Sequence, residues 1–167
     1  FGSPMIDEVS LVADAATLRP RAPASRESAA AAPHQDADVV LPFLPPITVA
    51  LALLVGHPVA ASCIANGYDG TVLSPSAVQL SPFACTEYRA PYDTPLDRQA
   101  TAYGLLVVLH EAEHIRYSDP NEIRTECRAL RDFVPALKRL KVPSRYWQSM
   151  KKAAISADRF VFGLREV

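Results

Sequence analysis

The sequence predicts a small α+β domain, in which a few short strands come before a series of helices. Residues 58–65 (PVAASCIA) alternate in the way a strand does, and turn-forming residues follow at 66–70 (NGYDG). The second half of the chain carries successive helix-start patterns and no internal repeat. With 167 residues and 49% hydrophobic content, the chain has enough material for one domain with a true core.

Four segments are expected along the chain. Residues 1–5 (FGSPM) are interpreted as a cloning remnant, and residues 6–40 as a flexible arm rich in Ala and Pro, because they hold few large apolar groups. An apolar segment covers residues 41–56, and the folded domain covers residues 57–167. The stretch MIDEVSLVADAATL lacks the basic and apolar regions of a signal peptide, so none is expected. The compartment, cytoplasmic or exported, stays open.

The stretch 39–56 (VVLPFLPPITVALALLVG) is the most membrane-like part of the sequence. Prolines interrupt its first half, and the apolar run 47–55 that follows is about 14 Å long as a helix. A bilayer core needs about 20 apolar residues. The prediction is a buried element of the domain, with membrane association as the alternative.

Charge and cysteine content argue against two classes of site. The 17 basic and 18 acidic side chains give a net charge of −1, so nucleic acid is not an expected partner. Cys63, Cys85 and Cys127 form no C-x-x-C pair, which argues against a cysteine zinc site. Cys63 and Cys85 flank the turn-rich segment and either form a disulfide or remain buried free thiols.

The central helix of the domain is predicted in DTPLDRQATAYGLLVVLHEAEHIRY. Thr94, Pro95 and Asp97 give it a capping hydroxyl, a proline in the first turn and an early acid. Its middle, AYGLLVVL, is apolar nearly all round, which places it in the core. A second helix is expected after SDP (118–120), with a kink or break at Pro135, and a third from Pro143.

The motif HEAEH at 110–114 lies at the polar end of this helix. On a helix His110 and His114 share one face, with their Cβ atoms about 6 Å apart, so both imidazoles can bind one metal ion. Glu111 lies at the neighbouring angle, where it can reach a metal-bound water. Glu113 points to another face and is expected to be a solvated charge. Ordinary hydrogen-bonded histidines are the alternative to a metal site.

A third metal ligand is sought in NEIRTE at 121–126. Here the sequence resembles the gluzincin class of zinc metalloproteases, which carry H-E-x-x-H on one helix and N-E-x-x-x-D or a close variant on a later one. The resemblance implies that Glu122 binds the metal and that Glu126, in place of the final Asp, orients a zinc-bound histidine. The ending E-x-x-x-E-C is also similar to that of small bacterial H-E-x-x-H domain proteins.

Other roles for the two acids remain open. Glu126 lies one turn deeper than Glu122 and comes nearer the level of His110 if the two helices pack antiparallel. Glu122 stands three residues after Asp119 and could instead complete a capping box. The ligand is therefore Glu122 or Glu126, with Glu122 favoured.

Two further features bear on substrate binding. The predicted strand 77–85 (AVQLSPFAC) either pairs with an extended peptide or covers the active-site helix. Tyr103 and Tyr117 lie one or two helical turns from the histidines, and each either donates a proton to an oxyanion or simply packs.

Together these features predict a minimal zincin-like domain, with short edge strands packed on a central active-site helix and further C-terminal helices. The expected activity is hydrolysis of peptide bonds with Zn²⁺ as cofactor, Glu111 as general base and a peptide or protein as substrate. The alternatives are a zincin-like binding or structural module without proteolytic activity, and a component of a larger assembly that docks on a protein partner.

Overall fold

A computed structural model describes residues 42–64 and 69–162, with side chains as far as Asp158. The predicted remnant (1–5), the whole of the predicted arm (6–40) and the boundary between the arm and the apolar segment lie outside these residues. The described part is an α+β fold of five α-helices, a short 3₁₀ helix and a three-stranded sheet, which confirms the predicted general class.

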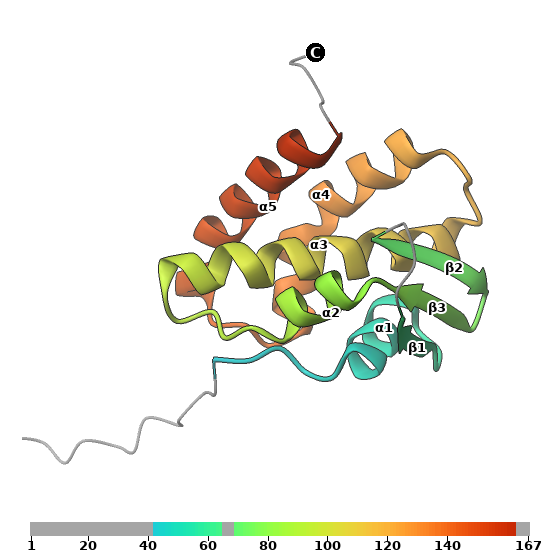
Figure 1. Cartoon of the computed structure of the whole chain (residues 1–167), viewed down its shortest axis with the longest axis horizontal. Coiled ribbons are helices and arrows are strands. Elements are labelled where there is room, and N and C mark those ends of the chain that lie inside the picture. Colours follow the sequence, from blue (N-terminus) through green and yellow to red (C-terminus); the bar gives the residue numbers. More distant parts are fainter. Residues whose placement is uncertain (1–41, 65–68, 163–167) are drawn as a thin grey trace, which may run out of the picture. The chain divides into compact units, whose positions relative to one another are not determined.

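Helix α3 (Pro95–Tyr117) is the centre of the domain (Figure 1). It begins as predicted, because the Thr94 side chain accepts a hydrogen bond from the N–H of Asp97 and Pro95 fills the first turn. Its apolar middle is buried. The helices that pack against it are α1 (Ile47–Val55), α2 (Pro82–Arg89), α4 (Glu122–Arg139) and α5 (Trp147–Phe162).

Helix α1 accounts for the apolar segment of the sequence. Ile47, Ala50, Leu51 and Leu54 are buried against the rest of the domain, which confirms the predicted buried element. No helix in the described part of the chain is long and apolar enough to cross a membrane. The segment therefore contributes to the core of the domain.

The sheet consists of β1 (Ala60–Cys63), β2 (Gly70–Ser74) and β3 (Ala77–Leu80) in the order β1-β3-β2. Strand β3 runs parallel to β1 and antiparallel to β2. Of the two alternatives for residues 77–85, pairing with an extended peptide is therefore wrong, because β3 is central, while β1 and β2 form the two edges. The strand also ends early, since the Ser81 side chain caps α2 and Pro82 begins that helix.

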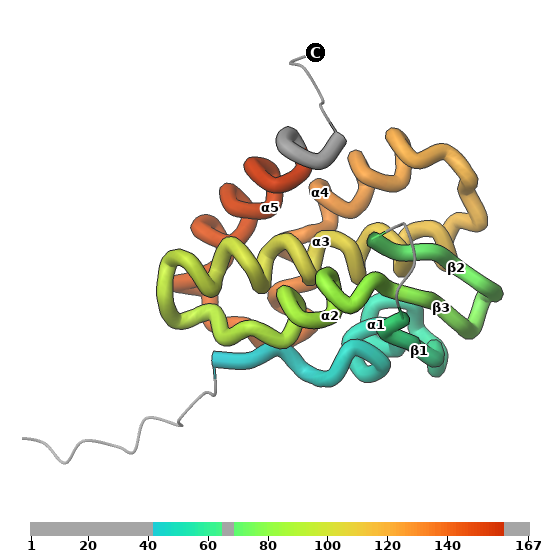
Figure 2. Tube along the Cα trace, in the orientation of Figure 1, coloured from blue at the N-terminus to red at the C-terminus, as the bar shows by residue number. Residues whose placement is uncertain are grey.

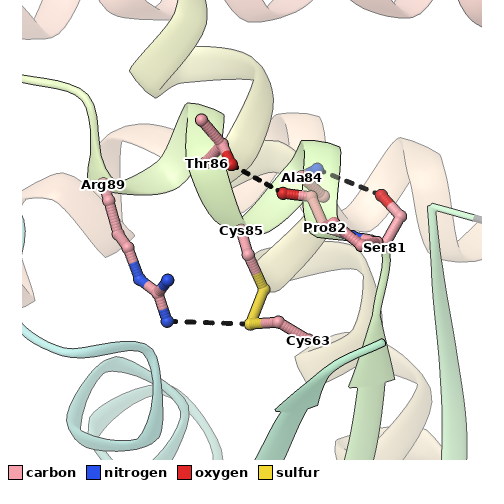
Figure 3. Close-up of a disulfide and its surroundings, with 7 residues drawn as sticks. All are labelled: Cys63, Ser81, Pro82, Ala84, Cys85, Thr86 and Arg89. Carbon is pink, nitrogen blue, oxygen red and sulfur yellow. Dashed lines mark hydrogen bonds between the residues drawn. A yellow bond between two sulfur atoms is a disulfide. The ribbon is translucent and has the colours of Figure 1, made fainter. Parts of the chain in front are cut away.

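A disulfide joins Cys63 at the end of β1 to Cys85 in α2 (Figure 3). The first of the two predicted alternatives for this pair is thus observed. One guanidinium nitrogen of Arg89 lies 3.7 Å from the sulfur of Cys63. The disulfide fixes one end of the sheet to the helix layer, while Cys127 is an exposed free thiol.

After α3 the chain turns and α4 runs back obliquely across it, as the trace in Figure 2 shows. Helix α4 does not end at Pro135, where a kink or break was predicted, but continues to Arg139. Pro135 is exposed, so water can satisfy the carbonyl that lacks its usual N–H donor. The 3₁₀ helix η1 (Ser144–Tyr146) then leads into α5, close to the predicted start at Pro143.

Candidate metal centre

Three side chains from α3 and α4 meet at the C-terminal end of α3. The Nε2 atoms of His110 and His114 lie 2.9 Å apart. One carboxylate oxygen of Glu122 lies 2.9 Å from the first Nε2 atom and 3.2 Å from the second. Four-coordinate zinc with bonds of about 2.1 Å keeps its ligand atoms about 3.3 Å apart, so this triad is only slightly tighter than a metal site. These three residues could hold a metal ion.

The hydrogen bonds made by the two Nδ1 atoms fix the proton of each imidazole on Nδ1, away from the point where the Nε2 atoms meet. Nδ1 of His114 lies 2.7 Å from the backbone carbonyl oxygen of Asp119, which can only accept, so Nδ1 carries the proton. Nδ1 of His110 lies 2.6 Å from a carboxylate oxygen of Glu126 and donates to it in the same way. In the neutral rings both Nε2 atoms then present lone pairs.

Three acceptors consequently face one point. Two imidazole lone pairs and a carboxylate oxygen repel one another unless a cation lies between them. Burial lowers the pKa of His110, but the neighbouring carboxylates, Glu126 foremost, outweigh burial and raise its pKa overall. The site therefore attracts a cation, either a proton or a metal ion.

The structure places the two candidate acids differently. Glu122 reaches the Nε2 atoms, although its side chain is 68% exposed, while the nearly buried Glu126 reaches the back of the His110 ring. The capping-box alternative for Glu122 is not observed. The side chain of Asn121 caps α4 by accepting from the N–H of Arg124, and Asp119 accepts from the N–H of Asn121.

Glu111 lies beside the triad and is 95% buried. Burial raises the pKa of its carboxyl group to about 7, against the lowering effect of the two histidines. A Cβ atom on Gly70, the first residue of β2, would lie 2.4 Å from a Glu111 carboxylate oxygen. The absence of a side chain at Gly70 thus lets the edge strand lie directly against this carboxyl group.

Glu113 is not the solvated charge that was predicted. Its side chain is fully buried and forms an ion pair with Arg116 one turn later on α3. A carboxylate oxygen of Asp132 on α4 lies 3.5 Å from the same guanidinium nitrogen of Arg116. The prediction failed because α4 covers this face of α3, which spacing along α3 alone does not reveal.

A cleft of about 910 Å³ opens over the triad. The walls come from the start of β2, from α3, from the α3–α4 turn and from the end of α5. Val72, Leu106 and Val107 supply apolar wall, while both histidines, Glu111, Glu122 and Glu126 supply polar wall. The cleft therefore joins the candidate metal centre to the edge strand.

The two tyrosines that the sequence singled out have different positions. Tyr103 lines the cleft together with Asp69. Burial, and after it the negative charge of Asp69, raises the pKa of the Tyr103 hydroxyl. Tyr117 is not among the lining residues, since its half-exposed ring lies against the guanidinium groups of Arg116 and Arg128. Of the two, only Tyr103 is positioned to contact a bound molecule.

Sequence reasoning missed the contribution of residues 69–72 and of Asp158 to the cleft. The glycine at the start of β2 was a signal, because a glycine inside a strand pattern often marks a close approach of another group. No comparable signal existed for Asp158, which reaches the cleft only through the packing of α5 on α3.

No known protein family, curated protein or solved structure matches this chain. The site must therefore be interpreted from its own geometry.

Proposed function

We propose that this protein is a zinc-dependent metallopeptidase built on a minimal zincin-like domain. The observation that carries the proposal is the convergence of two imidazole lone pairs and a carboxylate oxygen beside a second, buried carboxyl group. The other features of the cleft agree with this activity.

The donor set favours zinc among the common metal ions. Two imidazoles and one carboxylate are the protein ligands of many catalytic zinc sites, which leave a fourth position open. Calcium and magnesium prefer oxygen ligands alone. A zinc ion held here would supply an acidified water and polarise the carbonyl group to be attacked.

Glu111 is the residue best suited to move the proton. A general base works best when its pKa is near the operating pH, and burial raises the pKa of this carboxyl group to about 7. The positive charge of a metal ion would lower that pKa and favour the carboxylate. Glu111 would accept a proton from the attacking water and deliver it to the leaving amine.

Strand β2 offers a means of holding an extended peptide. It is an edge strand, and Gly70, Thr71 and Val72 line the cleft. A peptide that pairs with the side of β2 that faces no other strand among the described residues would lie along the cleft that holds the triad. Because backbone pairing does not depend on side-chain identity, β2 could hold extended peptides of many sequences.

The test is cleavage of a mixed peptide library by zinc-loaded wild type and Glu111→Gln, followed by mass spectrometry. The amide keeps the shape of the side chain but cannot take the proton, so the rate should fall by about 10²–10⁴-fold while zinc content and circular dichroism stay unchanged. Undiminished cleavage by Glu111→Gln would refute the assigned base. A wild type that holds zinc and binds peptides without cleaving them would instead be the binding module.

A further inference from the structure

We propose that the cleft selects substrates with a positively charged side chain, Lys or Arg, which binds at the end formed by Asp69 and Tyr103. This inference rests on the proposed peptidase function and adds a substrate class to it. Three independent features of the described residues support it, namely the charge of the walls, an unpartnered buried oxygen and the shape of the path between them.

The walls of the cleft carry an excess of negative charge. Among the described lining residues there is no lysine or arginine. Asp119 is compensated from outside by ion pairs with Arg124 and Arg128. Five further carboxyl groups line the cleft: Asp69, Glu111, Glu122, Glu126 and Asp158. A divalent metal ion offsets two of them, so the remainder attracts a cationic ligand.

Glu126 adds an observation that does not depend on this count. One of its carboxylate oxygens accepts from His110, but Oε1 is buried and has no hydrogen-bond partner among the described residues. A buried carboxylate oxygen without a donor is costly, and an ammonium or guanidinium group in the cleft would supply the donor.

The electrostatics around Tyr103 indicate the same end of the cleft. Burial raises the pKa of the Tyr103 hydroxyl, and the nearby carboxylates of Asp69, Glu87 and Glu126 raise it further. A negative potential that disfavours a phenolate favours a bound cation. The hydroxyl of Tyr103 and the carboxylate of Asp69 can both accept from such a group.

The path from the metal centre to this end fits a basic side chain. Tyr103 precedes His110 by seven residues on α3, which corresponds to about 10 Å along the helix axis. An extended peptide covers that distance in about three residues. Leu106 and Val107, which lie between Tyr103 and His110 on α3 and line the cleft, provide apolar wall that suits the methylene stem of Lys or Arg.

The experiment measures binding separately from cleavage. Zinc-loaded Glu111→Gln protein is titrated with N-acetylated, fluorescein-labelled peptides in which one lysine is moved through every position of an otherwise neutral sequence. Each peptide is paired with its norleucine counterpart. At one position lysine should bind about tenfold more tightly than norleucine, because a charge-assisted hydrogen bond is lost in the second peptide. Equal binding at every position would overturn the proposal.

Protein variants then assign the preference to its residues. Asp69→Asn in the same background should reduce the lysine preference to about twofold, while Asp93→Asn, an equal charge change on an exposed residue outside the lining of the cleft, should leave it intact. The same loss in both variants would indicate only general electrostatics and would overturn the assigned position. If Asp69→Asn does not fold, the lysine–norleucine pairs alone decide.

Two further results separate this inference from the proposed activity. If a free N-terminal amine replaces lysine with equal effect, the selected group is the terminus and the side-chain assignment is wrong. Lysine preference in a wild type that cleaves no peptide would refute the peptidase and leave the cationic site standing. Cleavage at a rate that does not depend on substrate charge would support the peptidase and refute the cationic site.

Discussion

The two halves of helix α3 bury different kinds of side chain. The N-terminal half packs against α2 so closely that a Cβ atom on Gly104 would lie 2.1 Å from the backbone nitrogen of Tyr88. Its buried Thr101 hydroxyl is within 2.9 Å of three backbone carbonyl oxygens. The C-terminal half instead buries ionisable groups, including His110, Glu111 and Glu113.

The difference shows where stability and chemistry are located in this helix. Close packing of small and apolar groups stabilises the fold without any ligand. Buried ionisable groups cost several kcal/mol each unless they find partners. Glu113 forms an ion pair with Arg116 of the same helix. The Nε2 lone pairs of the two histidines and the carboxylate of Glu122 face one another instead, and a bound cation would remove their mutual repulsion. Substitutions in the two halves should therefore have separable effects.

The largest effect is expected for His110→Ala and His114→Ala. Each substitution removes one of three proposed ligands, so zinc affinity should fall by more than about 100-fold. A change in a residue that only supports a ligand costs at most about that much. Folding stability without metal should fall by about 1 kcal/mol in His114→Ala, the value of a lost hydrogen bond, and by about 1–3 kcal/mol in His110→Ala, which leaves the buried Glu126 carboxylate without its donor. Metal content by mass spectrometry and titration calorimetry would measure the first effect, and urea unfolding the second.

His57→Ala is the matched control, because His57 is exposed and lies far along the chain from the triad. Equal zinc content in all four proteins would remove the basis for a metal centre in this half of α3.

Gly104→Ala should produce the reverse pattern in the other half. The added methyl group would meet backbone atoms of Glu87 and Tyr88, which cannot rotate away as a side chain can. The free energy of unfolding should fall by about 3 kcal/mol, and the melting temperature by about 10 °C. Zinc affinity of the folded protein should not change.

Gln99→Ala, at an exposed position of the same helix, should be nearly neutral. A Gly104→Ala protein of unchanged melting temperature would show that α2 and α3 are not packed as closely as described here.

Glu122→Gln and Glu126→Gln refine the comparison at the C-terminal half of α3, which carries the two proposed histidine ligands. Glu126 holds the back of the His110 ring, so its amide should cost about 10–100-fold in zinc affinity. Glu122 contacts both Nε2 atoms, and its amide should cost more. Competition with a zinc-binding dye would rank the two. A larger loss for Glu126→Gln would reverse the proposed roles.

The sequence predicted the local features of this site well. The start of α3 at Thr94 and Pro95 depends on neighbouring residues, and so does the shared face of His110 and His114. Such features depend on spacing along one helix. The antiparallel return of α4 was considered only as one alternative, although it decides where Glu122 and Glu126 reach.

The features that the sequence did not predict depend on packing between elements. Strand order made β2 the edge and β3 the centre, which a pattern of alternating residues cannot distinguish. Glu113 became buried because α4 covers it. The Cys63–Cys85 disulfide needed the end of β1 to meet α2 in space, and spacing along the chain left both alternatives open.

Gly70→Ala should have the smallest effect on stability and zinc affinity. It tests most directly the contact between β2 and the C-terminal half of α3. Its methyl group would lie 2.4 Å from a Glu111 carboxylate oxygen, and this flexible end of the side chain can move aside. Stability should therefore fall by only about 1 kcal/mol. Zinc affinity should stay as in wild type, because the three atoms nearest to the added methyl group all belong to Glu111, which is not a proposed ligand.

What should change in Gly70→Ala is the rate of cleavage. A displaced Glu111 is a poorer base, so kcat should fall by about tenfold, within the contribution of a general base, while KM for a peptide stays nearly constant. The double variant Gly70→Ala with Glu111→Gln should then be no slower than Glu111→Gln alone, because both changes act through the same carboxyl group. Additive losses would instead show that Gly70 acts on the bound peptide through the edge of β2, independently of Glu111.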